Sequence, residues 1–189
     1  MVLERHAPSR RRPDEAVLGV WNERDLIGHT SRAVTTVESY LTSETPAVEV
    51  PSAVAYYLKA LQADPEHIAE RGRQAGQALG NAPALAVAET VERVTRLVDS
   101  QADDTRLNTA AGVMLLTEYL PTRTFELTVH TCDLLQALNL NEDVPPSAAT
   151  AAARLGAELA VVRGFAAPLL LAITGRSALP AQFSVVQRT

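Results

Sequence analysis

The sequence predicts an all-α protein, because its composition and its apolar spacing favour packed helices over sheets. Hydrophobic residues make up 47% of the 189-residue chain, which is enough for one core, whereas aromatic residues make up only 4%. Alanine, leucine and valine are abundant, and alternating runs of β-branched residues are scarce. Apolar residues instead recur at helical spacing. We therefore expect a single helical domain over residues 14–189.

The N-terminal part of the chain predicts a flexible arm followed by a well-capped helix. Residues 1–13 include the stretch APSRRRP, for which a solvated basic arm is favoured over an anion-binding patch. A first long helix is expected from about residue 22 to 42, because Asn22 and Asp25 have the spacing of a capping box. A short helix through AVAYYLKAL is expected after Pro51.

Two more helices are expected in the middle of the chain. Asp64 and Pro65 begin the first, which runs to about residue 80 and has glycine at every fourth position over its second half. Arginine and glutamine interrupt that glycine face, so close packing against another helix is favoured over association in a membrane. The amphipathic stretch ALAVAETVERVTRLVDS predicts the next helix, and the polar stretch QADDTRLNTAAG predicts a loop.

A fourth long helix is expected from Pro121 to Leu138, with Pro121 in its first turn and an apolar stripe of leucines. Ser147 is expected to cap a fifth helix, and the chain after ITGR is expected to be irregular. The pattern as a whole predicts an antiparallel bundle with a C-terminal helical extension.

Charge and hydropathy exclude several kinds of partner. The 22 acidic and 17 basic residues give a formal charge of -5, and no stripe of lysine and arginine is visible, so nucleic acid is not an expected partner. The longest apolar run, FAAPLLLAI, is too short to span a bilayer, and the N-terminus lacks the apolar stretch of a signal peptide. Cys132 is the only cysteine. A cytoplasmic protein is expected.

Three residues have the spacing of a metal site. His29 lies three residues after Leu26, on the face expected to turn inward, and Glu126 and His130 lie one turn apart on a later helix. Two imidazoles and one carboxylate favour zinc over calcium or magnesium, and three protein ligands would leave an open position typical of catalytic zinc. The alternative is an ion pair between Glu126 and Arg123 with His130 merely packed, and spacing alone does not decide between the two.

Three segments resemble motifs of the mycothiol-dependent maleylpyruvate isomerase family, which belongs to the DinB-like metal-binding bundles. They are WNERDLIGHT, LPTRTFELTVHTCDLLQAL and LLAITGRSALP, the last similar to shorter family members, and together they span residues 21–182. The resemblance implies a DinB-like four-helix bundle whose metal, usually zinc, is held at His29, Glu126 and His130. It also places the arginine of the family motif at Arg123 and its aspartate at Asp133.

Two departures from the family pattern change what is expected. Only PDEAVLGV precedes the tryptophan motif, where the family usually has a full helix, so one bundle helix is expected to be short or missing. The groove left behind would suit a second copy of the chain in a homodimer. The isomerase itself has a separate C-terminal domain that contributes to its active site, so isomerisation of maleylpyruvate is not expected here.

The expected function is that of a metal-dependent enzyme in which a low-molecular-weight thiol, mycothiol by resemblance, acts on a small electrophilic substrate by addition, transfer or isomerisation. Arg123 and Arg176 are candidates for binding carboxylates of substrate or thiol cofactor, and a surface salt bridge is the favoured alternative for Arg176. Asp133 is expected to orient a ligand imidazole. Cys132 is interpreted as a small buried residue rather than a nucleophile. The alternative function is a non-catalytic bundle that binds a metal or a small molecule.

Overall fold

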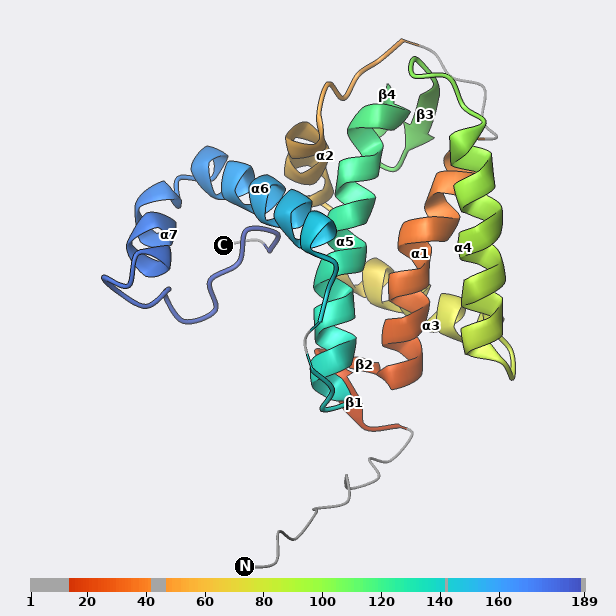
Figure 1. Ribbon diagram of the computed structural model, residues 1–189, viewed down its shortest axis with the longest axis horizontal. Helices are drawn as coiled ribbons and strands as arrows, with labels where there is room; N and C mark the ends of the chain where they lie inside the picture. Colours follow the sequence, from red (N-terminus) through yellow and green to blue (C-terminus); the bar gives the residue numbers. More distant parts are fainter. Residues whose placement is uncertain (1–13, 42–46, 142, 188–189) are drawn as a thin grey trace, which may run out of the picture.

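Helices dominate the computed structural model, which describes residues 14–41, 47–141 and 143–187 (Figure 1). The predicted basic arm over residues 1–13 lies outside the described residues. The helices are α1 (Glu23–Leu41), α2 (Ala53–Ala60), α3 (Pro65–Ala78), α4 (Pro83–Asp99), α5 (Leu116–Ala137), α6 (Pro146–Val162) and α7 (Ala166–Ile173). The strands form two antiparallel hairpins, β1 (Ala16–Leu18) with β2 (Trp21–Asn22), and β3 (Arg106–Thr109) with β4 (Gly112–Leu115).

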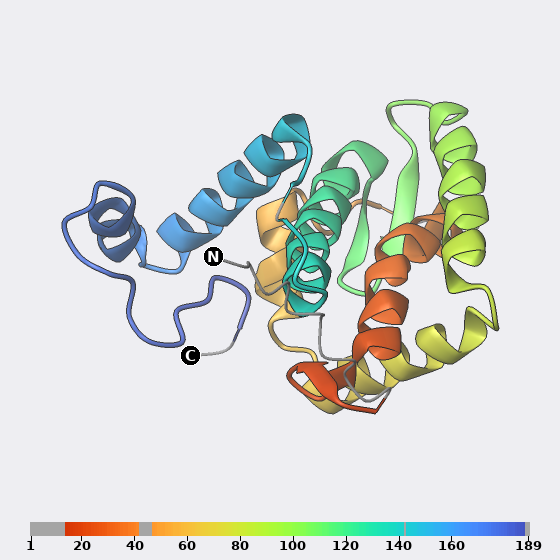
Figure 2. The same cartoon turned by 60° about the horizontal axis from the view of Figure 1, so that its bottom comes forward.

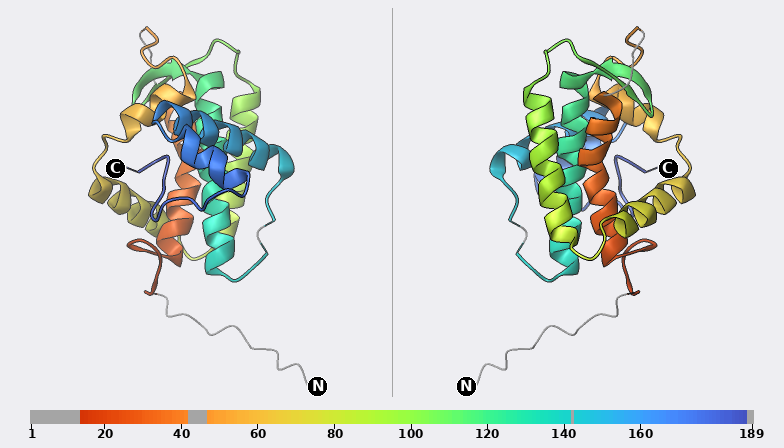
Figure 3. Two further views of the ribbon diagram at one scale, coloured as in Figure 1. Left: turned by 90° about the vertical axis from the view of Figure 1, so that its left-hand side faces the viewer. Right: turned by 90° about the vertical axis from the view of Figure 1, so that its right-hand side faces the viewer.

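The bundle is built around α1, which packs against α3, α4 and α5. The two views of Figure 3 show α1, α4 and α5 side by side, with α3 crossing one end of α1. Helix α6 packs across α5 and α2, while α7 contacts α6 and extends away from the bundle (Figure 2). This arrangement confirms the predicted all-α bundle with a helical C-terminal extension.

The capping box predicted before α1 is present. The backbone N–H of Asp25 donates to Asn22 Oδ1 at 2.9 Å, and the N–H of Asn22 donates to Asp25 Oδ2 at 3.4 Å. The β1–β2 hairpin precedes this cap and turns at Gly19, whose φ of 56° is in the left-handed region that glycine adopts without cost. Residues 16–22, which include Trp21, therefore form a hairpin, and α1 is the first helix in the described part of the chain.

The predicted loop over residues 101–112 was wrong from residue 106 onward, and the predicted start of α5 was also wrong. Residues 106–115 form the β3–β4 hairpin, in which Leu107 and Thr109 of β3 and Val113 and Met114 of β4 are buried. The hairpin leads directly into α5. The N–H of Leu116, the first residue of the helix, donates to the carbonyl of Thr105 at 2.8 Å and so ties the start of α5 to the start of the hairpin. Helix α5 thus begins five residues before Pro121, which lies inside the helix and removes one backbone hydrogen bond.

Two smaller expectations also differ from the structure. Helix α6 begins at Pro146 with no side-chain cap, so Ser147 lies inside its first turn. Leu138 is 43% exposed, and the deeply buried side of α5 is formed by residues nearer its start, which include Leu116 and Tyr119. The apolar stripe of leucines over the second half of α5 is therefore only partly a core face.

A close crossing of α1 and α3 positions the later site residues. A Cβ at Gly28 would lie 2.1 Å from the backbone nitrogen of Gly76, so only glycine allows the two helices to approach this closely. The predicted close packing of the glycine face therefore holds at Gly72 and Gly76, whereas Gly80 lies beyond the end of α3 with a φ of 65°. The crossing brings the polar residues of α1 next to those of α3.

The larger buried cluster lies between α1, α2, α5, α6 and the β3–β4 hairpin and includes Val37, Tyr57, Leu107 and Tyr119. A smaller cluster joins the start of α1 to α3. Among the described residues, no helix is long and apolar enough to cross a membrane. The cytoplasmic location, the homodimer and the single-domain organisation stay predictions.

Candidate metal centre and adjoining cavity

The three residues predicted as metal ligands lie together in the structure. Helix α1 supplies His29 and α5 supplies Glu126 and His130, and one ligand atom of each lies within 4.8 Å of the other two. His130 Nε2 is 3.3 Å from Glu126 Oε2, and the rings of His29 and His130 meet edge to face with centroids 4.7 Å apart. Two helices far apart in sequence therefore place two imidazoles and a carboxylate around one point.

The orientation of His29 depends on the β1–β2 hairpin and on α3. The indole of Trp21 stacks on the imidazole with ring centroids 4.1 Å apart, and its Nε1 donates to the carbonyl of Ala69 at 3.1 Å. Gly72 leaves room for the indole, because a Cβ there would lie 2.8 Å from Trp21 Nε1. The tryptophan of the motif thus holds His29 in place rather than binding a ligand itself.

Two neighbouring side chains orient the α5 residues of the cluster. Asp133 Oδ2 lies 2.9 Å from His130 Nδ1, which leaves Nε2 directed toward Glu126. The hydroxyl of Tyr57 on α2 donates to Glu126 Oε1 at 2.6 Å. A carboxylate on the distal nitrogen of a histidine is the usual support of a metal-ligating imidazole.

The pKa values of the cluster follow from burial and from these contacts. Burial raises the pKa of Glu126, but His130, Arg123 and Tyr57 together lower it to about 2. Burial lowers the pKa of His130, but the hydrogen bonds with Asp133 and Glu126 raise it to about 9. Burial and the neighbouring His130 lower the pKa of His29 to about 4. At neutral pH, Glu126 is therefore a carboxylate and His29 carries a free lone pair.

The residues present fit a divalent cation. His29 Nδ1 is the one fully buried side-chain polar atom among the described residues that has no hydrogen-bond partner. Such an atom costs roughly 1–3 kcal/mol, and coordination through it would remove that cost. Two nitrogens and one oxygen form a donor set that suits zinc or another first-row metal.

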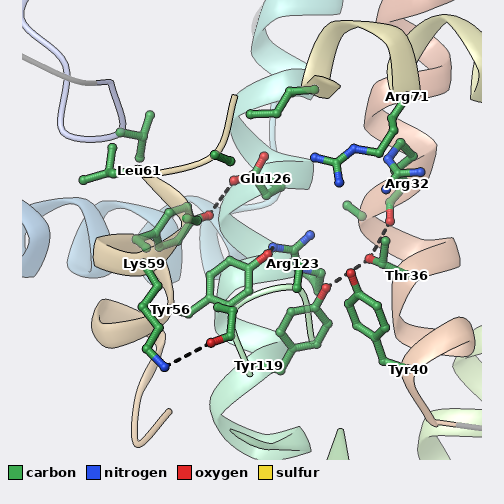
Figure 4. Close-up of a pocket in the computed structure, with 18 of the residues that line it drawn as sticks. Arg32, Thr36, Tyr40, Tyr56, Lys59, Leu61, Arg71, Tyr119, Arg123 and Glu126 are labelled. Carbon is green, nitrogen blue, oxygen red and sulfur yellow. Dashed lines mark hydrogen bonds between the residues drawn. The ribbon is translucent and has the colours of Figure 1, made fainter. Parts of the chain in front are cut away.

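A cavity of about 470 Å³ adjoins the cluster, and His29 and Glu126 form part of its wall. Figure 4 shows side chains from α1, α2, α3 and α5 directed into it. Its polar lining otherwise consists of arginine, lysine, threonine and tyrosine, namely Arg32, Thr36, Tyr40, Tyr56, Tyr57, Lys59, Arg71, Tyr119 and Arg123. The volume is that of a site for a small molecule.

The other predicted site residues lie at different distances from this cavity. Arg123 lines it, with its guanidinium 4.6 Å from the ring centroid of Tyr119 and its Nε donating to Thr122 Oγ1 at 2.9 Å. No ion pair joins Arg123 to a carboxylate in the described part of the chain, although its charge lowers the pKa of Glu126. Arg176 is exposed beyond α7 and does not line the cavity, and Cys132 is half-buried outside it.

Sequence analysis missed several polar residues of the cavity. Arg32 follows His29 by three residues and so shares its helix face, which is a signal that could have identified it. Tyr57 lies in an apolar helix segment, where a hydroxyl needs a partner. Arg71 sits on a helix with charged neighbours, and nothing in the sequence distinguishes it from a surface arginine.

The chain matches a known protein family. A sequence model of the mycothiol maleylpyruvate isomerase N-terminal domain family matches residues 7–135. The chain belongs to this family. The mostly helical fold with a few short strands is accordingly the expected all-α, DinB-like bundle. The family match includes all three candidate ligands and ends before α6.

Family membership relates the chain to enzymes that use mycothiol and act as isomerases. Searches of curated proteins and of solved structures found no match.

Proposed function

We propose that this member of the mycothiol maleylpyruvate isomerase N-terminal domain family is a metal-dependent enzyme that uses a low-molecular-weight thiol such as mycothiol. Its substrate would be a small electrophile that undergoes thiol addition, thiol transfer or isomerisation. The observation that carries the proposal is the convergence of His29, Glu126 and His130 within 4.8 Å, with His29 and Glu126 in the wall of a cavity of about 470 Å³. Family membership supports the role of mycothiol.

His29, Glu126 and His130 would hold a divalent cation, for which zinc is the proposed identity. Three protein ligands are the usual number at a catalytic zinc, where one coordination position is left for an exogenous ligand. A bound zinc ion supplies Lewis acidity and lowers the pKa of a thiol that coordinates it.

The remaining residues position these groups and bind the reactants. Asp133 fixes the Nδ1 side of His130, and the hydroxyl of Tyr57 fixes one oxygen of Glu126. Arg123 presents a positive charge to the cavity and would hold a carboxylate of the substrate or thiol. Arg176 stays a candidate for binding the thiol cofactor, and its exposed position makes it the weakest member of the set.

A non-catalytic bundle that binds a metal or only a small molecule is the alternative, and one observation favours its metal-free form. His130 contacts both Glu126 and Asp133, so these polar groups have partners without an ion. The buried and unpartnered Nδ1 of His29 is not explained by the metal-free form, and it supports the metal.

Elemental analysis and turnover assays test the two functions in sequence. Protein purified without added metal is expected to contain about one zinc or other first-row metal ion per chain. The absence of stoichiometric metal, even after reconstitution with zinc, would remove the metal-dependent enzyme. A panel of small electrophiles is then assayed with and without mycothiol, and turnover that requires the thiol is expected. Metal-loaded protein that is inert across the panel would instead identify a binding protein.

A further inference from the structure

The chain returns to the bundle after α7 and there forms part of the cavity wall. Residues 174–182 are all exposed, and this stretch loops back from α7 towards the bundle (Figure 2). Residues 183–185 are half-buried, and Val185 packs against the larger buried cluster. In the described part of the chain, Val186 is the one residue beyond α5 that lines the cavity. The wall is therefore completed by a segment close to the C-terminus.

Val186 lies at the opening of the cavity rather than in its interior. It is 38% exposed although it lines the cavity, whereas Ala33 and Tyr119 in the same wall are 3% and 0% exposed. Other exposed lining residues are Lys59 on α2 and Ala110 in the turn of the β3–β4 hairpin. Residues that contact both the cavity and solvent mark its mouth, so Val186 is in a position to control entry.

The contacts that hold this segment come from the junction between α6 and α7. Nη1 of Arg163 donates to the carbonyl of Ser184 at 3.0 Å. The rings of Phe165 and Phe183 meet edge to face with centroids 5.4 Å apart, and Cζ of Arg163 lies 5.2 Å from the centroid of Phe165. This clamp, formed by Arg163 and Phe165, can open without disturbing the bundle, because α7 buries no residue. Segments held by few contacts open locally at a low cost in free energy.

The backbone of the exposed stretch also favours release. Gln182, its last residue, has a φ of 60°, in the left-handed region that a side chain with a Cβ adopts at a cost. Gly175, near its start, has a φ of 72° and adopts that conformation freely. The docked segment therefore depends on a strained turn at Gln182, and release of the segment relieves this strain.

We propose that residues 183–187 form a lid over the mouth of the cavity, and that opening of the clamp swings Val186 aside and admits small molecules. Residues 174–182 would act as the hinge, and the junction of α6 and α7 would hold the closed state. This role explains why a helical extension with little buried surface leads back to the cavity. As regulation of a reaction, the lid rests on the proposed function, because only a reaction in the cavity would depend on entry to it.

A cysteine placed inside the cavity measures how often the lid opens. Ala33→Cys on α1 puts a thiol in the buried part of the wall, and Cys132→Ser removes the native thiol. Modification by N-phenylmaleimide is followed by mass spectrometry. In this background Phe183→Ala, which removes one ring of the aromatic pair, should raise the modification rate at least about fivefold.

Two controls separate opening of the lid from a general loosening of the protein. Leu179→Ala shortens an exposed apolar side chain of the hinge and should leave the rate unchanged. Ala88→Cys, an exposed position on α4, should be modified equally fast with and without Phe183→Ala. Ala60→Cys on α2 is a second reporter in the cavity wall, and thermal melts verify that each variant folds. An unchanged rate at both cavity cysteines in folded Phe183→Ala protein would overturn the lid.

Substitutions at the polar half of the clamp and at the mouth sharpen the assignment. Arg163→Gln should raise the rate at least about threefold, whereas Arg154→Gln, an exposed arginine of α6, should not. Val186→Ala leaves the clamp intact and widens the mouth, so it should speed modification by N-phenylmaleimide more than modification by the smaller iodoacetamide. Equal effects on both reagents would show that Val186 does not set the size of the opening.

The modification rates are measured in EDTA, so that the lid and the proposed function can fail separately. Faster modification in Phe183→Ala protein supports the lid even if no thiol-dependent turnover is found. Thiol-dependent turnover together with unchanged modification in the clamp variants supports the proposed function and removes the lid.

Discussion

The candidate metal centre and the cavity that adjoins it contain charged groups that are compensated to different degrees. On the α5 side, the carboxylates of Glu126 and Asp133 both contact His130, at 3.3 Å and 2.9 Å. On the side formed by α1 and α3, Arg32 and Arg71 contact no carboxylate in the described part of the chain. Both sides are built on the same close crossing of α1 with α3 and on the packing of α1 against α5.

This difference indicates which parts of the site depend on a ligand. In the candidate metal centre, His130 contacts Glu126 and Asp133, so these three residues have polar partners in the protein. Among the described residues, only His29 Nδ1 is a buried side-chain atom without a hydrogen-bond partner. On the side formed by α1 and α3, Arg32 and Arg71 have no such compensation from carboxylates in the described part of the chain.

The largest expected effect is the loss of metal when an imidazole of the cluster is removed. His29→Ala and His130→Ala should each lower the metal content from about one ion per chain to a small fraction of that, because two protein ligands seldom retain zinc against a chelator. Inductively coupled plasma mass spectrometry after gel filtration measures this content. His67→Ala, an exposed histidine on α3, is the control and should retain its metal. Full metal content in folded His29→Ala and His130→Ala proteins would disprove the ligand assignment.

The next largest expected effect concerns the close crossing of α1 and α3, which positions His29 and Arg32 of α1 next to Arg71 of α3. Gly28→Ala should lower the free energy of unfolding by roughly 3 kcal/mol, the upper end of the usual cost of overpacking, because its Cβ would meet the backbone of α3 at 2.1 Å. Urea denaturation measures this change. Gly156→Ala in α6 is the matched control, since its Cβ would lie 3.5 Å from Phe125 Cε2, an ordinary contact. The control should be neutral or stabilising by up to about 1 kcal/mol, and equal stabilities of the two variants would show that the crossing is less tight than described.

The sequence predicted which residues of the candidate metal centre lie together better than it predicted the cavity, and the reason is physical. His29, Glu126 and His130 lie on two long helices, where spacing and the capping box at Asn22 define which residues share a face. The arginine side depends on how α1 crosses α3, which is a tertiary contact that local periodicity does not encode. Motif resemblance included Arg123 but gave no reason to connect it with Arg71.

Prediction of the fold from the sequence was limited in the same way, because local periodicity identifies long helices better than short strands. Long helices with clear apolar spacing were predicted within a few residues of their observed ends, as for α1. The β3–β4 hairpin was missed because its short alternating pattern, with Leu107 and Thr109 buried, lies in a stretch whose composition is that of a loop. The start of α5 was predicted too late for the same reason. The missed hairpin ends at Leu115, and the helix begins at the next residue.

A smaller effect is expected when the support of His130 is weakened without removing a ligand. Asp133→Asn should lower metal affinity by roughly 10–100-fold while leaving stoichiometric binding at saturating zinc, because an amide holds the imidazole less well than a carboxylate does. Competition titration against a chromogenic chelator measures the affinity. Asp143→Asn, in the segment between α5 and α6, is the control for the loss of one negative charge. Unaltered affinity in Asp133→Asn would show that Asp133 lies beside the cluster without supporting it.

The smallest effect tests whether a protonated His130 compensates the charges of Glu126 and Asp133 in the absence of a metal ion. In metal-free protein the pKa of His130 is raised from 6.5 to about 9, since its hydrogen bonds with Asp133 and Glu126 outweigh the effect of burial. The protonated imidazole therefore stabilises the folded state fully below pH 6.5, and this contribution is lost as the pH rises through 9. Urea denaturation in EDTA should show the free energy of unfolding falling over this window in the wild type. His130→Gln, which has no titrating group at this position, should show a flatter profile. Identical slopes in the two proteins would mean that His130 is not held as a cation by its carboxylates, and the contrast between the two sides of the cavity would then lose its basis.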